Sequence, residues 1–259
     1  MADLPTLPDA LIGEVFGVLL VFVRVGSALM LLPGFGEPYV LSRFRLLLAL
    51  MLSLGLAAPL AAELPAPPAG ALELARLLGG EALFGLFVGA AARAVFGALH
   101  VAGTVIAFQS GLAAAAIFDP NEATQGTLPG NFLTTTALVL LFVTDAHHLL
   151  LEAVAASYQA LPAGGAPPLG DMAELISRLV DQAFALGTRI AAPLLVVSLL
   201  MYLAMGVLNR LMPAFQVFFV ALPLQMLLTF ATLMLSFAGG LLVFFALLDD
   251  GLGALMPGG

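Results

Sequence analysis

The sequence contains no cysteine, no lysine and no tryptophan, and charged residues make up only 9% of its 259 residues. Without cysteine, the chain has no disulfide framework, no thiolate metal ligand and no cysteine nucleophile. An ordinary soluble domain is about 25% charged and about 45–50% apolar, whereas this chain is 62% hydrophobic. So few charges cannot cover a water-exposed surface. Disorder is also excluded, because disordered segments combine low hydrophobicity with a high density of charge. The composition therefore favours a chain embedded in a lipid bilayer.

The charges that are present are mostly negative. Eight arginines stand against sixteen acidic residues, which gives a net charge of −8. Nucleic-acid binding requires cations that neutralise phosphates, so this balance argues against a nucleic-acid partner. The start Met1-Ala2-Asp3 lacks the positive segment that precedes the apolar run of a cleavable signal peptide. We therefore expect the first apolar run to remain in the mature protein.

Six apolar runs have the length of about 20 residues that a membrane-spanning helix needs. Clusters of proline and glycine at 33–38, 63–70 and 161–168 separate several of the runs and end helices. Residues 209–213 are expected to form a tight turn between the last two runs. The sequence thus predicts an all-α, polytopic membrane protein that forms one domain over residues 1–259. The runs are 10–32, 43–62, 77–99, 131–151, 175–205 and 214–247.

The arginines predict how the chain is oriented, because cytoplasmic loops are enriched in positive residues. Arg43 and Arg45 follow the first break, and Arg210 lies in the break before the last run. This pattern predicts an outer N-terminus and a cytoplasmic position for Arg43 and Arg45. The last run is long enough to be broken at Gly239-Gly240, which would invert the C-terminal tail.

The segment after the third run does not resemble a simple span. It stays apolar from His100 to Phe118, contains Gly103 and Gly111, and then reaches Asp119-Pro120. Non-helical backbone at membrane depth is tolerated only where it is buried in protein or lines a water-filled cavity. This favours a re-entrant or pore-facing loop. A helix end followed by a surface loop fits the composition equally.

Isolated charges lie within the apolar runs. An ionisable residue inside a membrane segment costs about 2.5–3.5 kcal/mol on insertion scales and usually faces protein or water. Glu14 and Arg24 are about 15 Å apart along a helix, so they cannot form a direct pair within one helix. We expect each to contact a partner on another helix or subunit. Glu81 and Arg93 are also isolated charges in an apolar run and need a partner in the same way.

Gly85 and Gly89 have the GxxxG spacing that lets helices pack closely in membranes. This spacing indicates packing, but it does not distinguish contact within the chain from contact between subunits.

The adjacent histidines His147 and His148 are the only other candidates for a chemical site. On a helix they point about 100° apart and cannot grip one metal as an i, i+4 pair would. A zinc site would have to recruit Asp145 or Glu152. We expect a polar helix terminus or a hydrogen bond between subunits instead, and no metal, cofactor or catalytic residues. The sequence contains neither HExxH nor GxSxG.

Four blocks of sequence follow one another in a recognisable order. They are Arg24-Val25-Gly26 with Pro33-Gly34-Phe35-Gly36, Arg43 and Arg45; Gly111 to Phe118-Asp119-Pro120; Leu141-Phe142 with His147-His148 and Leu161-Pro162-Ala163-Gly164; and Asn209-Arg210-Leu211-Met212-Pro213 with Val217-Phe218 and Leu222-Pro223-Leu224. With these blocks the chain resembles the FliR/SctT family of type III secretion export-gate components. It departs from the family pattern at Leu41, Asp145-Ala146, Gln216 and Ala221.

The resemblance implies a non-enzymatic subunit of the bacterial inner membrane, located in the flagellar basal body and partly lifted towards the periplasm. With FliP-like and FliQ-like subunits and an FlhB-like gate protein, it would form, among membrane lipids, the channel for unfolded flagellar proteins. An injectisome T component is the alternative within the family. A small-molecule permease is the alternative outside it, although the two halves show no repeat of the kind that many permeases have.

The resemblance also implies roles for individual residues. Residues 109–122 would form a plug-like gate loop, and a second set would make structural or inter-subunit contacts. The loop residues are Gln109, Gly111, Ile117, Phe118, Asp119 and Pro120, and the contact residues are Arg24, Pro33, Arg43, Arg45, His147, His148, Asn209, Arg210, Pro213 and Pro223.

Overall fold

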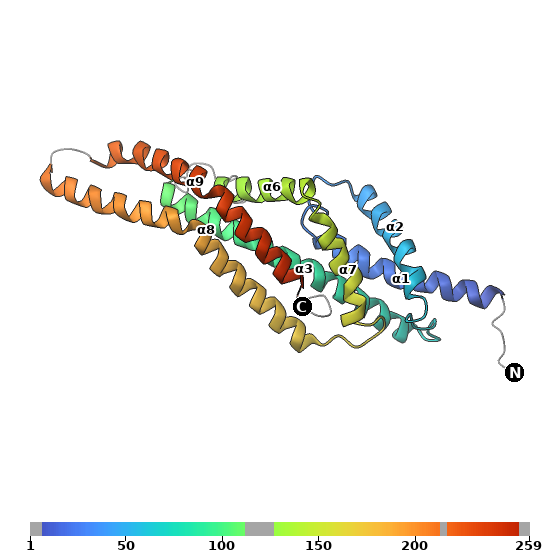
Figure 1. The fold of residues 1–259 in the computed structure, drawn as a ribbon. Coiled ribbons are helices and arrows are strands. Elements are labelled where there is room, and N and C mark those ends of the chain that lie inside the picture. The colour runs from blue at the N-terminus through green and yellow to red at the C-terminus, as the bar shows by residue number, and fades with distance from the viewer. Residues whose placement is uncertain (1–6, 112–126, 213–216, 254–259) are drawn as a thin grey trace. The chain divides into compact units, whose positions relative to one another are not determined.

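The structure, a computed structural model, describes residues 7–111, 127–212 and 217–253. Within these ranges its regular elements are helices, without strands (Figure 1). Among the described residues, five helices are long and apolar enough to cross a membrane, and α6 with α7 would make a sixth span if they formed one bent segment. The predicted all-α architecture is confirmed. The helices are α1 (Leu7–Leu31), α2 (Ser42–Leu60), α3 (Ala71–Ser110), α6 (Leu128–Val143), α7 (His147–Ala160), α8 (Leu169–Leu211) and α9 (Val217–Gly253).

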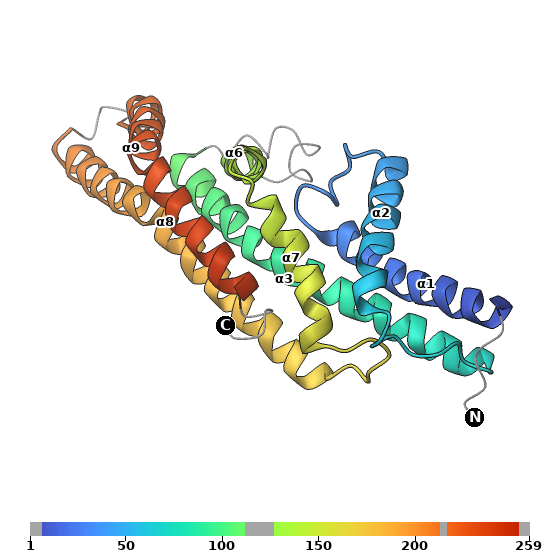
Figure 2. The ribbon, with the colours of Figure 1, turned by 45° about the vertical axis from the view of Figure 1, so that its right-hand side comes forward.

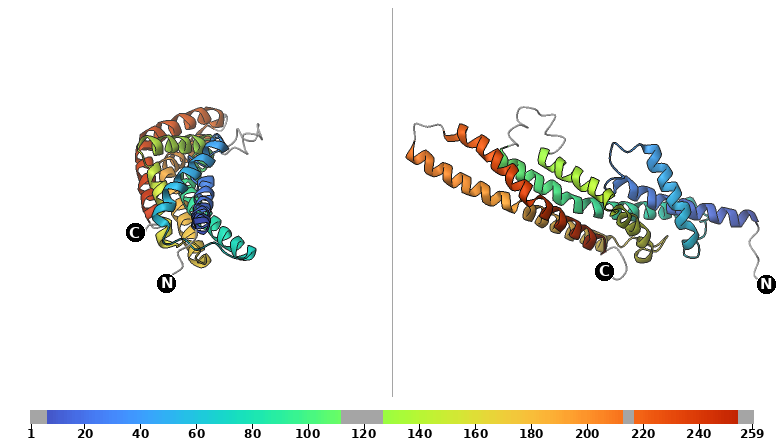
Figure 3. Two further views of the ribbon diagram at one scale, coloured as in Figure 1. Left: turned by 90° about the vertical axis from the view of Figure 1, so that its right-hand side faces the viewer. Right: turned by 45° about the horizontal axis from the view of Figure 1, so that its top comes forward.

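The helices form two compact units. Unit 1 consists of Met1–Arg93, Thr144–Ser177 and Asp249–Gly259, and unit 2 consists of Ala94–Val143 and Arg178–Leu248. In unit 1, α2 packs against α1 (Figure 2). In unit 2, α8 and α9 run side by side in opposite directions (Figure 3). The largest buried apolar side chains of unit 1 include Leu20, Leu29, Phe84, Leu150 and Tyr158, and those of unit 2 include Leu99, Ile106, Leu133, Leu141 and Phe244.

Helix α3 is longer than the third apolar run predicted. It continues without a break through His100 and Gly103 to Ser110, so the backbone of residues 100–110 is helical and not a loop. The helix ends at Gly111, which has a φ of 76°. A glycine in this left-handed conformation is a common helix terminator. The predicted third run ended at residue 99, whereas α3 ends at Ser110. The sequence therefore placed the end of this helix too early.

The fourth apolar run, 131–151, is broken. Helix α6 ends at Val143 and α7 begins at His147. Between them Asp145 adopts a φ of 58°, the one positive φ of a non-glycine residue in the described part of the chain. Asp and Asn tolerate this conformation better than other side chains do. The sequence reading did not predict this interruption, because the apolar pattern continues on both sides of it.

The last two helices also differ from the predicted boundaries. Helix α8 extends through Asn209 and Arg210 to Leu211, so these residues form its last turn and not part of a tight turn. Helix α9 is continuous through Gly239-Gly240, where a break had been considered. The interiors of α8 and α9 contain Pro193 and Pro223. Prolines are tolerated inside membrane helices because neighbouring groups can satisfy the carbonyls that they leave free.

Candidate functional site: a buried ion pair and its surroundings

The strongest polar feature of unit 1 is an ion pair between α1 and α3. Arg24 Nε donates to Glu81 Oε2 at 2.7 Å, and Arg24 Nη2 donates to Glu81 Oε1 at 3.2 Å. Both side chains are fully buried. Two parallel N–H···O bonds of this kind fix the orientation of the two groups as well as their distance. Arg24 thus has its charge partner on another helix of the same chain.

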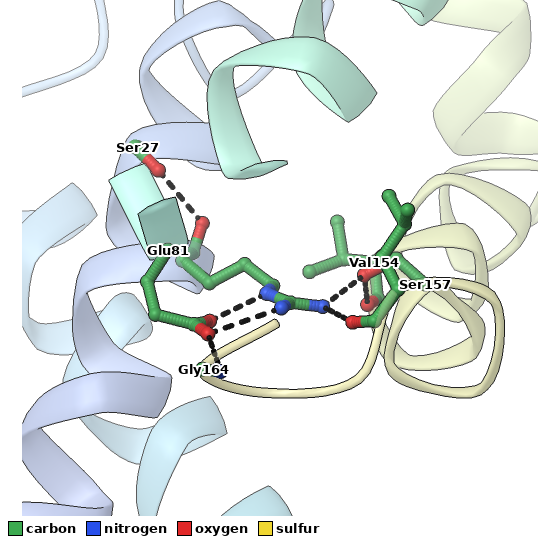
Figure 4. A network of polar contacts seen from close by, with 7 residues as sticks. Ser27, Glu81, Val154, Ser157 and Gly164 are labelled. Carbon is green, nitrogen blue, oxygen red and sulfur yellow. Dashed lines mark hydrogen bonds and ion pairs between the residues drawn. The ribbon is translucent and has the colours of Figure 1, made fainter. Parts of the chain in front are cut away.

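The remaining polar atoms of the pair contact α7 and the segment after it. Arg24 Nη1 donates to the Leu161 carbonyl oxygen at 2.8 Å and to Ser157 Oγ at 3.4 Å. Glu81 Oε1 also accepts from the Gly164 backbone N–H at 2.9 Å. The guanidinium thus binds both Glu81 and Ser157, which lie on opposite sides of Figure 4, with Gly164 below the carboxylate. A buried ion pair is tolerable only when such additional bonds satisfy both groups.

Two aromatic rings cover the guanidinium. The Arg24 Cζ atom lies 3.9 Å from the centre of the Tyr158 ring and 4.7 Å from the centre of the Phe84 ring. Both distances are within the range of cation–π attraction. The Tyr158 hydroxyl is buried and has no hydrogen-bond partner among the residues that the structure describes. The rings therefore shield the charge from water and join α3 and α7 to α1.

Glycines of α3 allow α1 to approach closely next to the ion pair. A Cβ atom at Gly85 would overlap the Ser27 Oγ and Arg24 carbonyl oxygen atoms. A Cβ atom at Gly89 would lie 2.8 Å from the Ala28 carbonyl oxygen. The GxxxG face, whose partner the sequence left open, therefore packs against α1 within the chain.

The loop between α1 and α2 is held by two arginines. Arg45 Nε donates to the Phe35 carbonyl oxygen at 2.9 Å, and Arg45 Nη2 donates to the Glu37 carbonyl oxygen at 3.0 Å. Arg93 Nη2 lies 3.9 Å from Glu37 Oε1. Pro33 is buried in the same loop, whereas Arg43 is exposed at the start of α2. Arg45 thus acts as a donor to the loop backbone.

Unit 2 has a smaller polar cluster, which is uncharged. The Gln225 side chain of α9 donates through Nε2 to the Gln109 carbonyl oxygen and lies 3.3 Å from the Tyr202 hydroxyl. Gln109 belongs to the last turn of α3, where carbonyl oxygens lack partners within the helix. Gln225 therefore caps α3 directly before Gly111, and it follows Pro223 by two residues.

A third cluster lies at the start of α7. One ligand atom each of Asp145, His147 and His148 lies within 4.8 Å of the others. The two imidazole rings are 4.2 Å apart between centres, and His148 Nδ1 lies 3.2 Å from the Asp145 carbonyl oxygen. The break in the helix therefore brings Asp145 to the two histidines, as a metal site would require. Asp145 and His148 are exposed, so water reaches this cluster.

The other predicted residues are only partly placed. Asn209 and Arg210 are exposed in the last turn of α8. Gln109 and Gly111 lie at the end of α3. Ile117, Phe118, Asp119, Pro120 and Pro213 lie outside the described residues.

Comparisons with known proteins identify the family. Residues 15–250 match the family model described as bacterial export proteins, family 1. The chain is 39% identical to flagellar biosynthetic protein FliR of Caulobacter vibrioides over 227 residues, which cover 87% of this chain and 90% of that protein. It is 32% identical to FliR of Bacillus subtilis over 83% of both chains. The chain belongs to this family of bacterial export proteins.

The chain is also similar to a protein that is named for translocation. Yop proteins translocation protein T of Yersinia pestis is 30% identical to this chain over 169 residues, which cover 64% of this chain and 65% of that protein. The matches confirm the FliR/SctT resemblance inferred from the four sequence blocks. Within the residues that the structure describes, five helices are long and apolar enough to cross a bilayer. Both findings fit a membrane protein of a type III export apparatus.

The sequence did not predict which residues form the contacts of the ion pair in unit 1 and of the neutral cluster in unit 2. Arg24 and Glu81 were noted separately, although each is an isolated charge of opposite sign in a different apolar run. That complementarity marked both residues as needing a partner, but it did not identify the partner. Gln225 and Tyr202 had no comparable signal, because a single amide or phenol in a long apolar helix does not identify its acceptor.

Proposed function

We propose that this chain is a membrane subunit of the bacterial flagellar type III export gate. With FliP-like and FliQ-like subunits and an FlhB-like gate protein, it would form the channel through which unfolded flagellar proteins leave the cell. The match over residues 15–250, together with a FliR relative that is 39% identical, is the observation that carries this proposal. We further propose the bacterial inner membrane as its location and the flagellar basal body as its assembly.

The exposed surface of the helices supports a role in a larger complex. In the most apolar stretch of α2 only 11% of the residues are buried inside the chain, and in that of α8 only 17% are buried. Large side chains such as Met51, Leu203 and Leu235 are more than half exposed. Partner helices or lipid must cover this surface, because membrane helices associate through close packing of such faces.

The buried charges support a structural role more than an enzymatic one. The Arg24 guanidinium and the Glu81 carboxylate are both fully engaged by protein groups. A general acid or base needs access to the proton that it moves, and the burial of this pair leaves none. We therefore propose a non-enzymatic subunit that uses no cofactor.

Residues 109–122 are proposed to close the channel. Gly111 and the alanines at 113–116 have few side-chain rotamers to reorder, so this segment could move aside at low cost. Ile117 and Phe118 would supply apolar bulk for the seal. Deleting residues 111–118 should leave assembly intact but make planar bilayers that contain the complex conduct ions. An assembled complex that remained ion-tight would contradict this role.

The central experiment is purification of the chain from its native membrane in mild detergent, followed by mass spectrometry. The proposal expects FliP-like and FliQ-like subunits in the same complex, and recovery of the chain alone would overturn it. An injectisome T component is the second candidate, favoured by the Yersinia relative. Deletion of the gene separates the two candidates, because only the flagellar assignment predicts loss of motility.

A further inference from the structure

A groove of about 680 Å³ in unit 1 lies between the N-terminal part of α1 and the C-terminal end of α2. Gly13 and Gly17 of α1 form one wall, and Ala57 and Ala58 of α2 contribute to the other. The one ionisable residue that lines it is Glu14, since all its other lining residues are glycine, alanine, proline, valine or leucine. The side chains that line the groove are thus apolar except for a single carboxylate.

Glu14 has no partner among the described residues. Its side chain is exposed, and no hydrogen bond or ion pair joins it to another described group. It lies inside the candidate membrane span Leu11–Leu31, where an acid normally pairs with a cation or faces water. Glu81, which also lies in an apolar helix, pairs with Arg24 of the same chain. No arginine lines the groove, and the sequence has no lysine, so the lining of the groove supplies no cation for Glu14.

Small residues leave free space on the α1 side of the groove. A Cβ atom at Gly13 would meet no atom within 4 Å, so the backbone of α1 is bare on this side. Gly17 is already in use, because a Cβ atom there would lie 2.9 Å from Leu64 Cδ1. Bare backbone and small side chains allow a second helix to approach closely in a membrane. The small residues and the single carboxylate therefore both fit an apolar helix that carries one cation.

We propose that this groove binds an apolar helix of another membrane subunit, and that a single lysine or arginine of that helix pairs with Glu14. The inference rests on the proposed function, which supplies such subunits. It goes beyond that function by assigning the contact to one groove and by specifying the charge of the partner.

Two substitutions test the groove in the complex purified from membranes. Glu14→Gln keeps the size of the side chain but removes its charge, and it should weaken association about tenfold or more, since truncating one partner of a desolvated charge pair mainly speeds dissociation. Gly13→Leu should block the groove sterically and abolish association. Gly55→Leu is the matched control, because a Cβ atom there also meets nothing within 4 Å and Gly55 does not line the groove.

Cysteine chemistry identifies the occupant, because the chain has no cysteine of its own. Ala58→Cys should react with maleimide in the separate chain and become protected in the complex, whereas Gly70→Cys, in the segment before α3, should react in both. A crosslinker attached at Ala58→Cys should capture a peptide that contains lysine or arginine. A Glu14→Lys variant should lose association with the partner helix. Replacing the lysine or arginine of that helix by glutamate should restore it.

Several outcomes would overturn the inference. These are an unprotected cysteine in the complex, normal association of both Glu14→Gln and Gly13→Leu, crosslinks to lipid alone, and capture of a helix without a cation. In each of these cases the wild-type chain still assembles, so the proposed function survives. Failure of the wild-type chain to recover any membrane subunit would overturn the function and this inference together.

Discussion

The two units bury polar groups of different kinds. In unit 1 the largest of them are ionic, the guanidinium of Arg24 and the carboxylate of Glu81, both fully buried. In unit 2 the buried polar residues of the described chain are neutral: Ser110, Ser198, Gln225 and Thr229. A buried charge that loses its partner costs far more than a buried amide that loses one. Unit 1 should therefore depend on a single contact, whereas the stability of unit 2 should be spread over its packing.

The largest effect is expected at the ion pair. Glu81→Ala leaves the Arg24 guanidinium buried without its carboxylate, and breaking a buried pair in this way costs about 3–5 kcal/mol. The free energy of unfolding, measured in detergent by titration with a denaturing surfactant, should fall by that amount. If Glu81→Ala cost under about 1 kcal/mol, the level of a surface ion pair, the contrast between the units would disappear.

A double variant separates the pair from the space that it fills. Arg24→Met with Glu81→Leu replaces both charges by apolar groups, and such replacements are often neutral or stabilising. The double variant should therefore be much more stable than Glu81→Ala alone. It also removes the donors to Leu161 and the acceptor for Gly164, so the segment after α7 should become more accessible to protease even where overall stability is retained.

The second effect concerns close packing in unit 2. A Cβ atom at Gly103 would overlap the backbone N and Cα atoms of Gly130 on α6, and backbone atoms cannot rotate away. Gly103→Val should cost about 3 kcal/mol, at the upper end of the usual cost of overpacking. Gly97→Val, on the same helix, is the control, because a Cβ atom there meets nothing within 4 Å. Equal thermal midpoints for the two variants would show that α3 and α6 do not depend on this contact.

These contacts indicate what the sequence could and could not predict. Apolar runs separated by proline and glycine predicted the helices, because length and composition are local properties. The partner of Gly85 on α1 and that of Gly103 on α6 are long-range facts, and a glycine spacing does not name them. The break at Asp145 was also invisible, since it depends on a left-handed backbone conformation inside an apolar run and not on a turn-forming cluster.

Charge patterns had an intermediate value. Isolated charges at Arg24 and Glu81 correctly marked positions that need partners, but two acids, Glu14 and Glu81, were available to the arginine. Helix geometry excluded Glu14 as a direct partner within α1. Only the packing of α3 against α1 selected Glu81, so this pairing required the tertiary structure.

The third effect tests the neutral cluster of unit 2. Gln225→Leu removes the cap of α3 and leaves the Gln109 carbonyl oxygen without its donor. The loss should be about 1–2 kcal/mol, the cost of an unsatisfied buried acceptor. Gln109→Ala is the control, because the acceptor is a backbone atom and survives that substitution. The comparison of the units requires Gln225→Leu to be milder than Glu81→Ala, and a larger loss would reverse it.

The smallest effect is expected at the second ion pair of unit 1. Arg93 and Glu37 are 3.9 Å apart, and the Arg93 side chain is 49% exposed. Exposed pairs contribute about 0–1 kcal/mol because water and salt screen them. Arg93→Gln should therefore shift the thermal midpoint little, and raising the salt concentration should shrink even that difference. The same rise in salt should leave the difference between wild type and Glu81→Ala nearly unchanged, since the Arg24–Glu81 pair is closed to solvent. If both differences shrank alike, salt would be reaching the buried pair, and burial would not be what distinguishes the ionic core of unit 1.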